Sequence, residues 1–163
     1  MKEPKNYLGK AKKWNLFILV TSCISAFFGV LSIGKSFTDK LENYSIYEKY
    51  AQTMFEYNTG VLYRGFLILN FAVLVFLIYR YFKANQLLGA GELAPKYPYY
   101  VAIGMMVLNF LFTQLITPKV ELIEGLQLGV IASISGVVSV LIMALPLIVM
   151  LMNLFKGENS EAQ

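Results

Sequence analysis

Few side chains in this sequence could carry out chemistry. The 163 residues include no histidine and one cysteine, Cys23. Without histidine, neither a Ser–His–Asp triad nor a Cys–His nucleophile pair can be built. One cysteine is also too few for a structural zinc site or for a disulfide within the chain. We therefore predict no enzyme, no catalytic residue, no cofactor and no metal site.

The remaining candidates are uncharged amides inside long apolar runs. Asn70 and Asn109 each fall near the middle of such a run, and Gln114 follows Asn109 by about one and a half helical turns. Because the asparagines have similar depth, we expect a hydrogen bond between them, and such bonds contribute about 0.6–2 kcal/mol in membranes. The three amides either join helices or line a pore, and joining helices is the preferred interpretation.

Small residues at helical spacing form a second candidate feature. Glycine, alanine and serine at intervals of three or four residues let membrane helices approach closely. Such spacing favours close packing within one bundle, while homo-oligomerisation and docking to a larger membrane protein remain alternatives. The predicted helix-packing residues are Ser22, Ala26, Gly29, Gly125, Gly129, Ser133 and Gly136.

Four long apolar runs must position these residues. Apolar residues make up 57% of the chain and charged residues 15%, against about 45–50% and about 25% in soluble domains. About 20 apolar residues in a helix cross the hydrocarbon core of a bilayer. We therefore predict an all-α membrane protein, a four-transmembrane-helix bundle with its membrane domain over residues 14–155. The predicted spans are residues 14–34, 61–79, 98–117 and 126–155.

Several residues near the ends of the spans predict where helices end, bend or meet the membrane interface. Arg64 lies just inside the second span, so we expect its charge to reach the membrane interface. Gly34 is expected to end the first span, and Pro146 to kink the last one. Residues 83–96 contain glycines and are expected to form a flexible connection between the second and third spans.

The basic residues predict an orientation in the membrane. The side that holds both termini carries nine basic and four acidic residues, or +5, and the opposite side carries five and six, or −1. Cytoplasmic segments of membrane proteins are enriched in lysine and arginine. We therefore predict a multi-pass cell-membrane protein, of bacterial type, with a basic N-terminus (1–13) and a tail (156–163) in the cytoplasm. Orientation accounts for the basic charge, so nucleic acid is not predicted as a partner.

The longest segment between spans, residues 35–60, has apolar residues at helical spacing. We predict an extracytoplasmic amphipathic helix over about 36–58, which covers the bundle or rests at the level of the lipid headgroups. A second apolar stripe indicates that the helix could also contact a partner. The tyrosines that could face this partner are Tyr44, Tyr47, Tyr50 and Tyr57.

The centres of the spans hold no Asp, Glu, Lys or Arg, which argues against carriers coupled to protons or cations. We therefore expect an accessory, regulatory or assembly subunit of a larger membrane complex. Its expected partners are the lipid bilayer and another membrane protein or a second copy of the chain. The alternative is an oligomeric transporter or channel for a small solute. A lipid-directed enzyme built on Glu56, Glu121 and Glu124 near Arg64 is less favoured, because solvated surface charge explains these residues.

Overall fold

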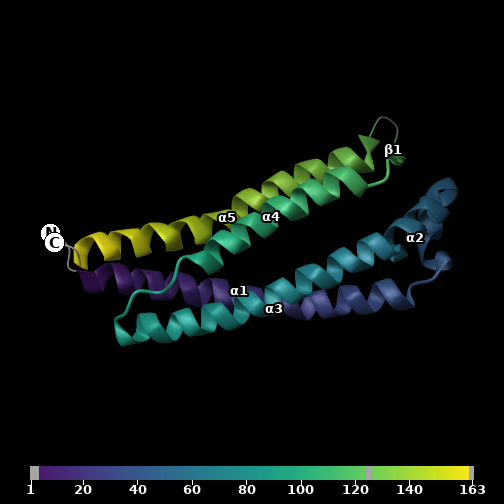
Figure 1. Ribbon diagram of the computed structural model, residues 1–163. Helices are drawn as coiled ribbons and strands as arrows, with labels where there is room; N and C mark the ends of the chain where they lie inside the picture. Colours follow the sequence, from purple (N-terminus) through teal and green to yellow (C-terminus); the bar gives the residue numbers. More distant parts are fainter. Residues whose placement is uncertain (1–3, 124–125, 162–163) are drawn as a thin grey trace.

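The computed structural model describes residues 4–123 and 126–161, and the chain is almost entirely helical (Figure 1). Each of its four long helices contains a segment long and apolar enough to cross a membrane. The predicted all-helical chain with four helices that could span a membrane is thereby confirmed, and these four helices indicate a multi-pass membrane protein. The long helices are α1 (Pro4–Thr38), α3 (Val61–Ala90), α4 (Tyr97–Ile116) and α5 (Leu128–Glu161).

Three of these helices run further than the apolar runs indicated. The first helix passes through Gly34 and ends at Thr38, so Gly34 does not end it. The connection expected over 83–96 is helical as far as Ala90, and Gly91 ends α3 in the left-handed conformation at φ 83°. The predicted tail at 156–163 is helical as far as Glu161. In the extension of α3, Ala84 and Leu88 are buried in the core, so packing against neighbouring helices supports this part of the helix.

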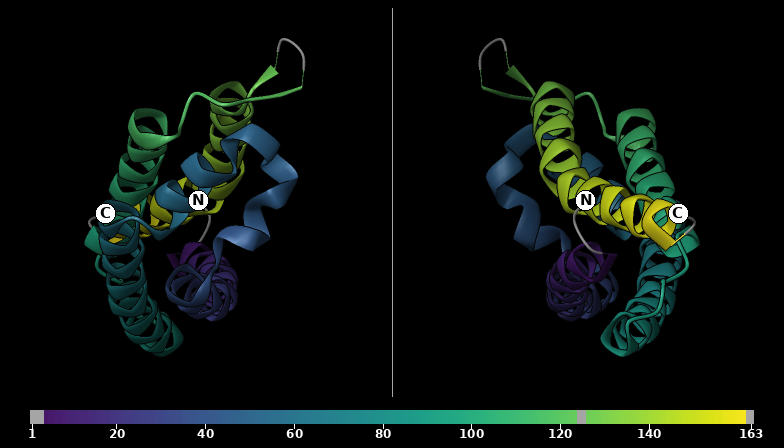
Figure 2. Two further views of the ribbon diagram at one scale, coloured as in Figure 1. Left: turned by 90° about the vertical axis from the view of Figure 1, so that its right-hand side faces the viewer. Right: turned by 90° about the vertical axis from the view of Figure 1, so that its left-hand side faces the viewer.

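The bundle has two distinct ends (Figure 1). We call the end where α1 begins and α5 finishes the terminal end, and the opposite end the loop end. Helix α1 packs against both α3 and α5, and α4 packs mainly against α5. Viewed along the bundle, the four helices stand around a central region, and α5 changes direction along its length (Figure 2). The helix contains Pro146, and a proline removes one backbone donor and kinks a helix in this way.

The buried core lies mainly at the terminal end. Its centre is a stacked pair of tyrosine rings, Tyr81 and Tyr99, with centroids 5.4 Å apart. Alanines such as Ala11 and Ala84, both fully buried, allow the helices around this pair to approach closely. An ion pair between Lys96 and Glu158 joins the start of α4 to the end of α5. The chain is thus best packed near the end that carries both termini.

The single amphipathic helix expected over 36–58 is not what the structure contains. The segment consists of a 3-10 helix, η1 (Leu41–Tyr50), and a short helix α2 (Ala51–Thr59). Glu48, at φ 48°, breaks the helical geometry within η1. Before η1, the Asp39 carboxylate accepts hydrogen bonds from Asn43 Nδ2 at 2.5 Å and from the Tyr44 hydroxyl at 2.6 Å. Such local side-chain bonds compete with a continuous helix, which explains the break after α1.

We call residues 41–59 the loop-end cap. Tyr44 and Met54 are buried in the cap and form one cluster with Val120 from the connection between α4 and α5. That connection contains the only strands in the described residues, β1 (Glu121–Ile123) and β2 (Leu126–Gln127), which pair antiparallel. The apolar side of the cap is therefore folded onto the bundle and its loop.

Candidate functional site: a cavity among the four long helices

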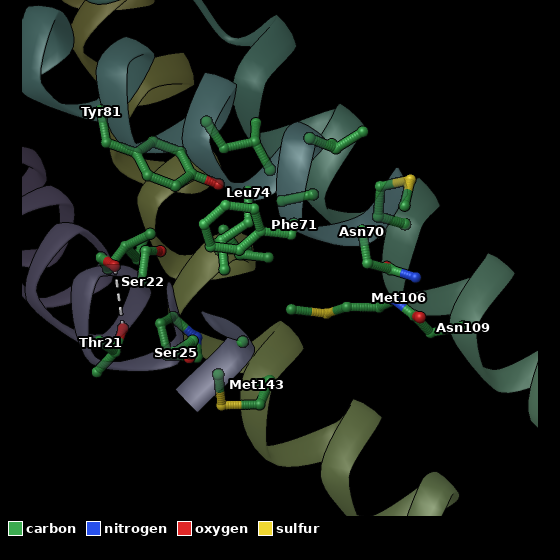
Figure 3. A pocket seen from close by; sticks show the side chains of 18 of the residues that line it. Thr21, Ser22, Ser25, Asn70, Phe71, Leu74, Tyr81, Met106, Asn109 and Met143 are labelled. Carbon is green, nitrogen blue, oxygen red and sulfur yellow. Dashed lines mark hydrogen bonds between the residues drawn. The ribbon is translucent and has the colours of Figure 1, made fainter. Parts of the chain in front are cut away.

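A cavity of about 370 Å³ lies among the four long helices (Figure 3). This volume falls within the range of small-molecule sites, which is about 300–1,000 Å³. Most of the wall is apolar, and the lining includes no charged side chain. Two exposed serines, Ser25 and Ser32, line it, so it is not a sealed void. The polar lining residues are Thr21, Ser22, Ser25, Ser32, Asn70, Tyr81 and Asn109.

Asn70 and Asn109 both line the cavity. Their amides lie on the same side of it, close to Met106 (Figure 3). The expected bond between them is absent: Asn70 Nδ2 donates to the Phe66 carbonyl of its own helix at 2.9 Å. Within the described residues the Asn109 amide has no hydrogen-bond partner, so it keeps its full hydrogen-bonding capacity beside the cavity.

Hydroxyl groups of α1 form the facing wall of the cavity. Thr21 Oγ1 donates to the carbonyls of Phe17 and Ile18 at 3.0 Å each, within the helix. The Ser22 and Ser25 hydroxyls make no hydrogen bond within the part of the chain that the structure describes. Because these residues are three or four positions apart, they share one face of α1. The sequence predicted Ser22 as a helix-packing residue. It did not predict that the hydroxyl groups on this face of α1 would line a cavity.

A second cavity of about 270 Å³ lies beside the first, between α4 and α5. Its own lining includes Thr113 and Ser139. Three residues line both cavities: Met106, Asn109 and Met143. The two spaces are therefore neighbours, and Asn109 lies at their common boundary.

The third predicted amide, Gln114, plays a different part. Its Oε1 accepts a hydrogen bond from Ser133 Oγ at 2.6 Å, and Ser133 Oγ is also 2.7 Å from the Gly129 carbonyl. Gln114 does not line either cavity. This bond joins α4 to α5, whereas Asn70 and Asn109 lie beside the larger cavity.

The predicted small residues are found in two settings. Gly29 lines the larger cavity and Gly136 the smaller one, and each faces a phenylalanine ring. A Cβ atom at Gly29 would lie 3.1 Å from Phe71, and one at Gly136 would lie 3.1 Å from Phe110. By contrast, a Cβ at Gly129 would meet nothing within 4 Å. Ala26 is half-buried, and Gly125 lies outside the described residues.

A buried asparagine that the sequence analysis missed, Asn15, is bonded to a residue of the cavity wall. Asn15, fully buried, donates from Nδ2 to the Tyr81 carbonyl at 2.9 Å and accepts from the Tyr99 hydroxyl at 2.7 Å. It therefore joins α1, α3 and α4. Tyr81 itself lines the cavity, so this group fixes one wall. The sequence alone did not single out Asn15, which is the second residue of the predicted first span and follows Lys12 and Lys13 closely.

Arg64 binds the end of α1. Its Nε and Nη2 atoms donate to the Ser36 carbonyl at 3.0 and 2.6 Å, and the guanidinium lies 4.6 Å from the centre of the Phe37 ring. The last carbonyls of a helix lack intrahelical partners and carry partial negative charge, so a cation is stabilised there. Arg64 thus fastens the start of α3 to the end of α1.

The cap tyrosines differ in exposure. The Tyr44 ring is buried and stacks on Tyr47 with centroids 6.2 Å apart, because residues three apart align in a 3-10 helix. Tyr50 packs against the same cluster, and Tyr57 lies 5.2 Å from Tyr63 of α3. The hydrogen bond from Tyr44 and then that from Asn43 lower the pKa of Asp39. Burial, with the Asp39 bond, raises the pKa of Tyr44.

The described acidic residues considered for a lipid-directed enzyme, Glu56 and Glu121, lie in separate elements. Glu56 accepts from Gln52 in α2, Glu121 lies in β1, and Glu124 is outside the described residues. Among residues 4–123 and 126–161, no three His, Cys, Asp or Glu side chains are grouped to hold a metal ion. The chain matches no protein-family model, and no curated protein or solved structure is significantly similar to it.

Proposed function

We propose that this protein is an accessory, regulatory or assembly subunit of a larger membrane complex, and that its loop-end cap contacts the partner. The observation behind the proposal is Ile46, whose side chain is 79% exposed on η1. The cap lies outside the four candidate spans, so lipid tails are not the natural cover for this residue. The neighbouring residues Tyr44 and Tyr47 hold the cap against the bundle and so keep Ile46 in place.

The partner in this proposal is another membrane protein. A photoreactive phenylalanine analogue at Ile46 should form one adduct with a different membrane protein in native membranes. The same analogue at Gln52, an exposed polar position of the cap, should give much less of it. Ile46→Glu should prevent co-purification of the crosslinked protein at native expression. Crosslinks only to lipid, or only to a second copy of the chain, would contradict an accessory role.

The proposed orientation places both termini in the cytoplasm of a bacterial cell and the cap outside. It rests on the lysine and arginine bias described above and on the common end shared by the start of α1 and the end of α5 (Figure 1). In a Cys23→Ser chain, an impermeant maleimide added to intact cells should label Gln52→Cys and spare Asn159→Cys. The reverse pattern would overturn the orientation.

The alternative function, transport of a small solute in an oligomer, is supported by the paired cavities. They share Met106, Asn109 and Met143, so a movement of these side chains would connect them. Proteoliposomes should then take up an uncharged solute such as glycerol, and Asn109→Leu should slow the uptake while Gln114→Leu should not. Vesicles that stay as impermeable as protein-free ones would contradict this alternative.

A further inference from the structure

We propose that the larger cavity binds a neutral amphiphile, a single apolar chain that ends in an uncharged ester and hydroxyl headgroup. This inference is independent of the partner proposed for the cap, because none of the residues that line the cavity belongs to the cap. It rests on three properties of the cavity: its apolar wall, its unused hydrogen-bonding groups and its lack of charge.

The apolar wall provides room for a chain. Phe71, Leu74 and Met106 project toward the cavity from α3 and α4 (Figure 3). Methionine side chains adapt to irregular apolar ligands because their rotatable bonds and polarisable sulfur fit several shapes. Met105, Met106 and Met143 all line the cavity, so this wall suits a flexible chain better than a rigid ring system.

The polar groups provide both donors and acceptors. Asn109, Ser22 and Ser25 line the cavity, and within the described residues none of the three side chains has a hydrogen-bond partner. In an apolar setting, a polar group without a partner costs free energy, and a ligand that supplies one recovers it. A glyceryl ester matches this set, because its carbonyl accepts from an amide or hydroxyl and its own hydroxyls donate to the Asn109 carbonyl oxygen.

The missing charge determines the ligand class. None of the lining residues is Asp, Glu, Lys or Arg, so a carboxylate or ammonium headgroup would be buried without a counter-ion. Burial of an uncompensated charge is far more costly than burial of a neutral polar group. The cavity should therefore reject a fatty acid anion and accept its glycerol ester, although both carry the same chain.

Native mass spectrometry of the full chain in detergent tests the proposal with two probes, 1-decanoylglycerol and decanoate. At pH 8 decanoate is ionised, because an aliphatic carboxyl group such as that of glutamate has a pKa of about 4.3. We expect one saturable molecule of 1-decanoylglycerol per chain and affinity for decanoate at least about tenfold weaker. Equal or tighter binding of decanoate would overturn the proposal, as would the absence of saturable binding.

Variants locate the site. Asn109→Leu removes the amide, and Ser25→Leu puts a larger side chain on the facing wall of the cavity; each should weaken 1-decanoylglycerol binding about tenfold. Gln114→Leu and Ser135→Leu are matched controls outside the cavity and should bind as the unaltered chain does. Unchanged binding in both cavity variants would contradict the assignment. Should one cavity variant fail to fold, the other remains decisive, and a diazirine form of the probe should label residues 21–32 of the unaltered chain.

Discussion

Asn15 at the terminal end joins helices, whereas Asn70 and Asn109 in the cavity do not. At the terminal end, Asn15 has both sides of its amide bonded to other helices and is fully buried. In the cavity, Asn70 is bonded only within its own helix, and no partner for Asn109 is found among the described residues. Of these three asparagines, only Asn15 joins helices, because only its amide has partners on other helices in the part of the chain that the structure describes.

Small residues show the same contrast. At the terminal end, Ala11 and Ala84 are fully buried and let the helices close around Tyr81 and Tyr99. Along the cavity, Ser22 and Ser25 are also small, but the space in front of them is the cavity itself. Small residues therefore mark close packing only where a neighbouring helix is present to use the space.

The strongest test of this contrast is Asn15→Leu. The substitution leaves the Tyr99 hydroxyl without its acceptor and removes the hydrogen bonds that join α1 to α3 and α4. The free energy of unfolding should therefore fall by about 1–3 kcal/mol. Asn70→Leu should cost clearly less, since it loses only a bond within its own helix. Unfolding in a mixed detergent–denaturant series measures both, and equal losses would contradict the contrast.

A smaller loss is expected at the loop end from Arg64→Met. The substitution keeps an apolar stem and removes both N–H donors to the Ser36 carbonyl. Hydrogen bonds from charged groups contribute about 1.5–3 kcal/mol when buried, and partial exposure should place this loss near the lower figure. Lys40→Met, an exposed cation of the same end, should change the unfolding free energy little. If the free energy of unfolding fell no more in Arg64→Met than in Lys40→Met, Arg64 would not stabilise the loop end.

The cap gives a prediction that depends on pH. Because the bond from Tyr44 lowers the pKa of Asp39 below its ordinary 3.8, the contact stabilises the cap above that pH. The stabilisation is lost as the pH falls through the lowered value. Tyr44→Phe should raise the pKa of Asp39 toward 3.8, measured from its carboxyl carbon by NMR, and Tyr47→Phe should leave it unchanged. An unchanged pKa in Tyr44→Phe would show that this bond does not hold the break after α1.

The smallest expected effects come from glycine. In an open helical position alanine is favoured over glycine by about 1 kcal/mol, and Gly104 has nothing within 4 Å of an added Cβ. Gly104→Ala should therefore stabilise the chain. Gly29→Ala should gain less or lose stability, because its Cβ would meet Phe71 at 3.1 Å. Thermal unfolding compares the two, and an equal gain in both would show that Phe71 moves away at no cost.

The sequence was sufficient for the four spans because length and apolar content alone define them. It also placed Asn70 and Asn109 at similar depth, and both line one cavity. It failed for the segment after α1, where hydrogen bonds from Asn43 and Tyr44 to Asp39 replace a continuous helix. Periodicity cannot report such bonds, since the apolar spacing of residues 41–59 is compatible with either helix type.

Asn15 was missed for a related reason. Hydropathy places it at the edge of a span beside lysines, where an asparagine needs no partner. Only the crossing of α3 and α4 over this turn buries it beside Tyr81 and Tyr99. The cavity could not be predicted either, because an unfilled space depends on helix positions that no single run of residues specifies.

Two double-mutant cycles test the central contrast most directly. One combines Asn15→Leu with Tyr99→Phe, and the other combines Asn70→Leu with Asn109→Leu, with unfolding free energy as the readout. Coupling between hydrogen-bonded side chains in membrane proteins averages about 0.6 kcal/mol and reaches about 1.7 kcal/mol. We predict coupling near the upper figure for Asn15 and Tyr99 and none for Asn70 and Asn109. Coupling between the two cavity asparagines as large as that between Asn15 and Tyr99 would contradict the account.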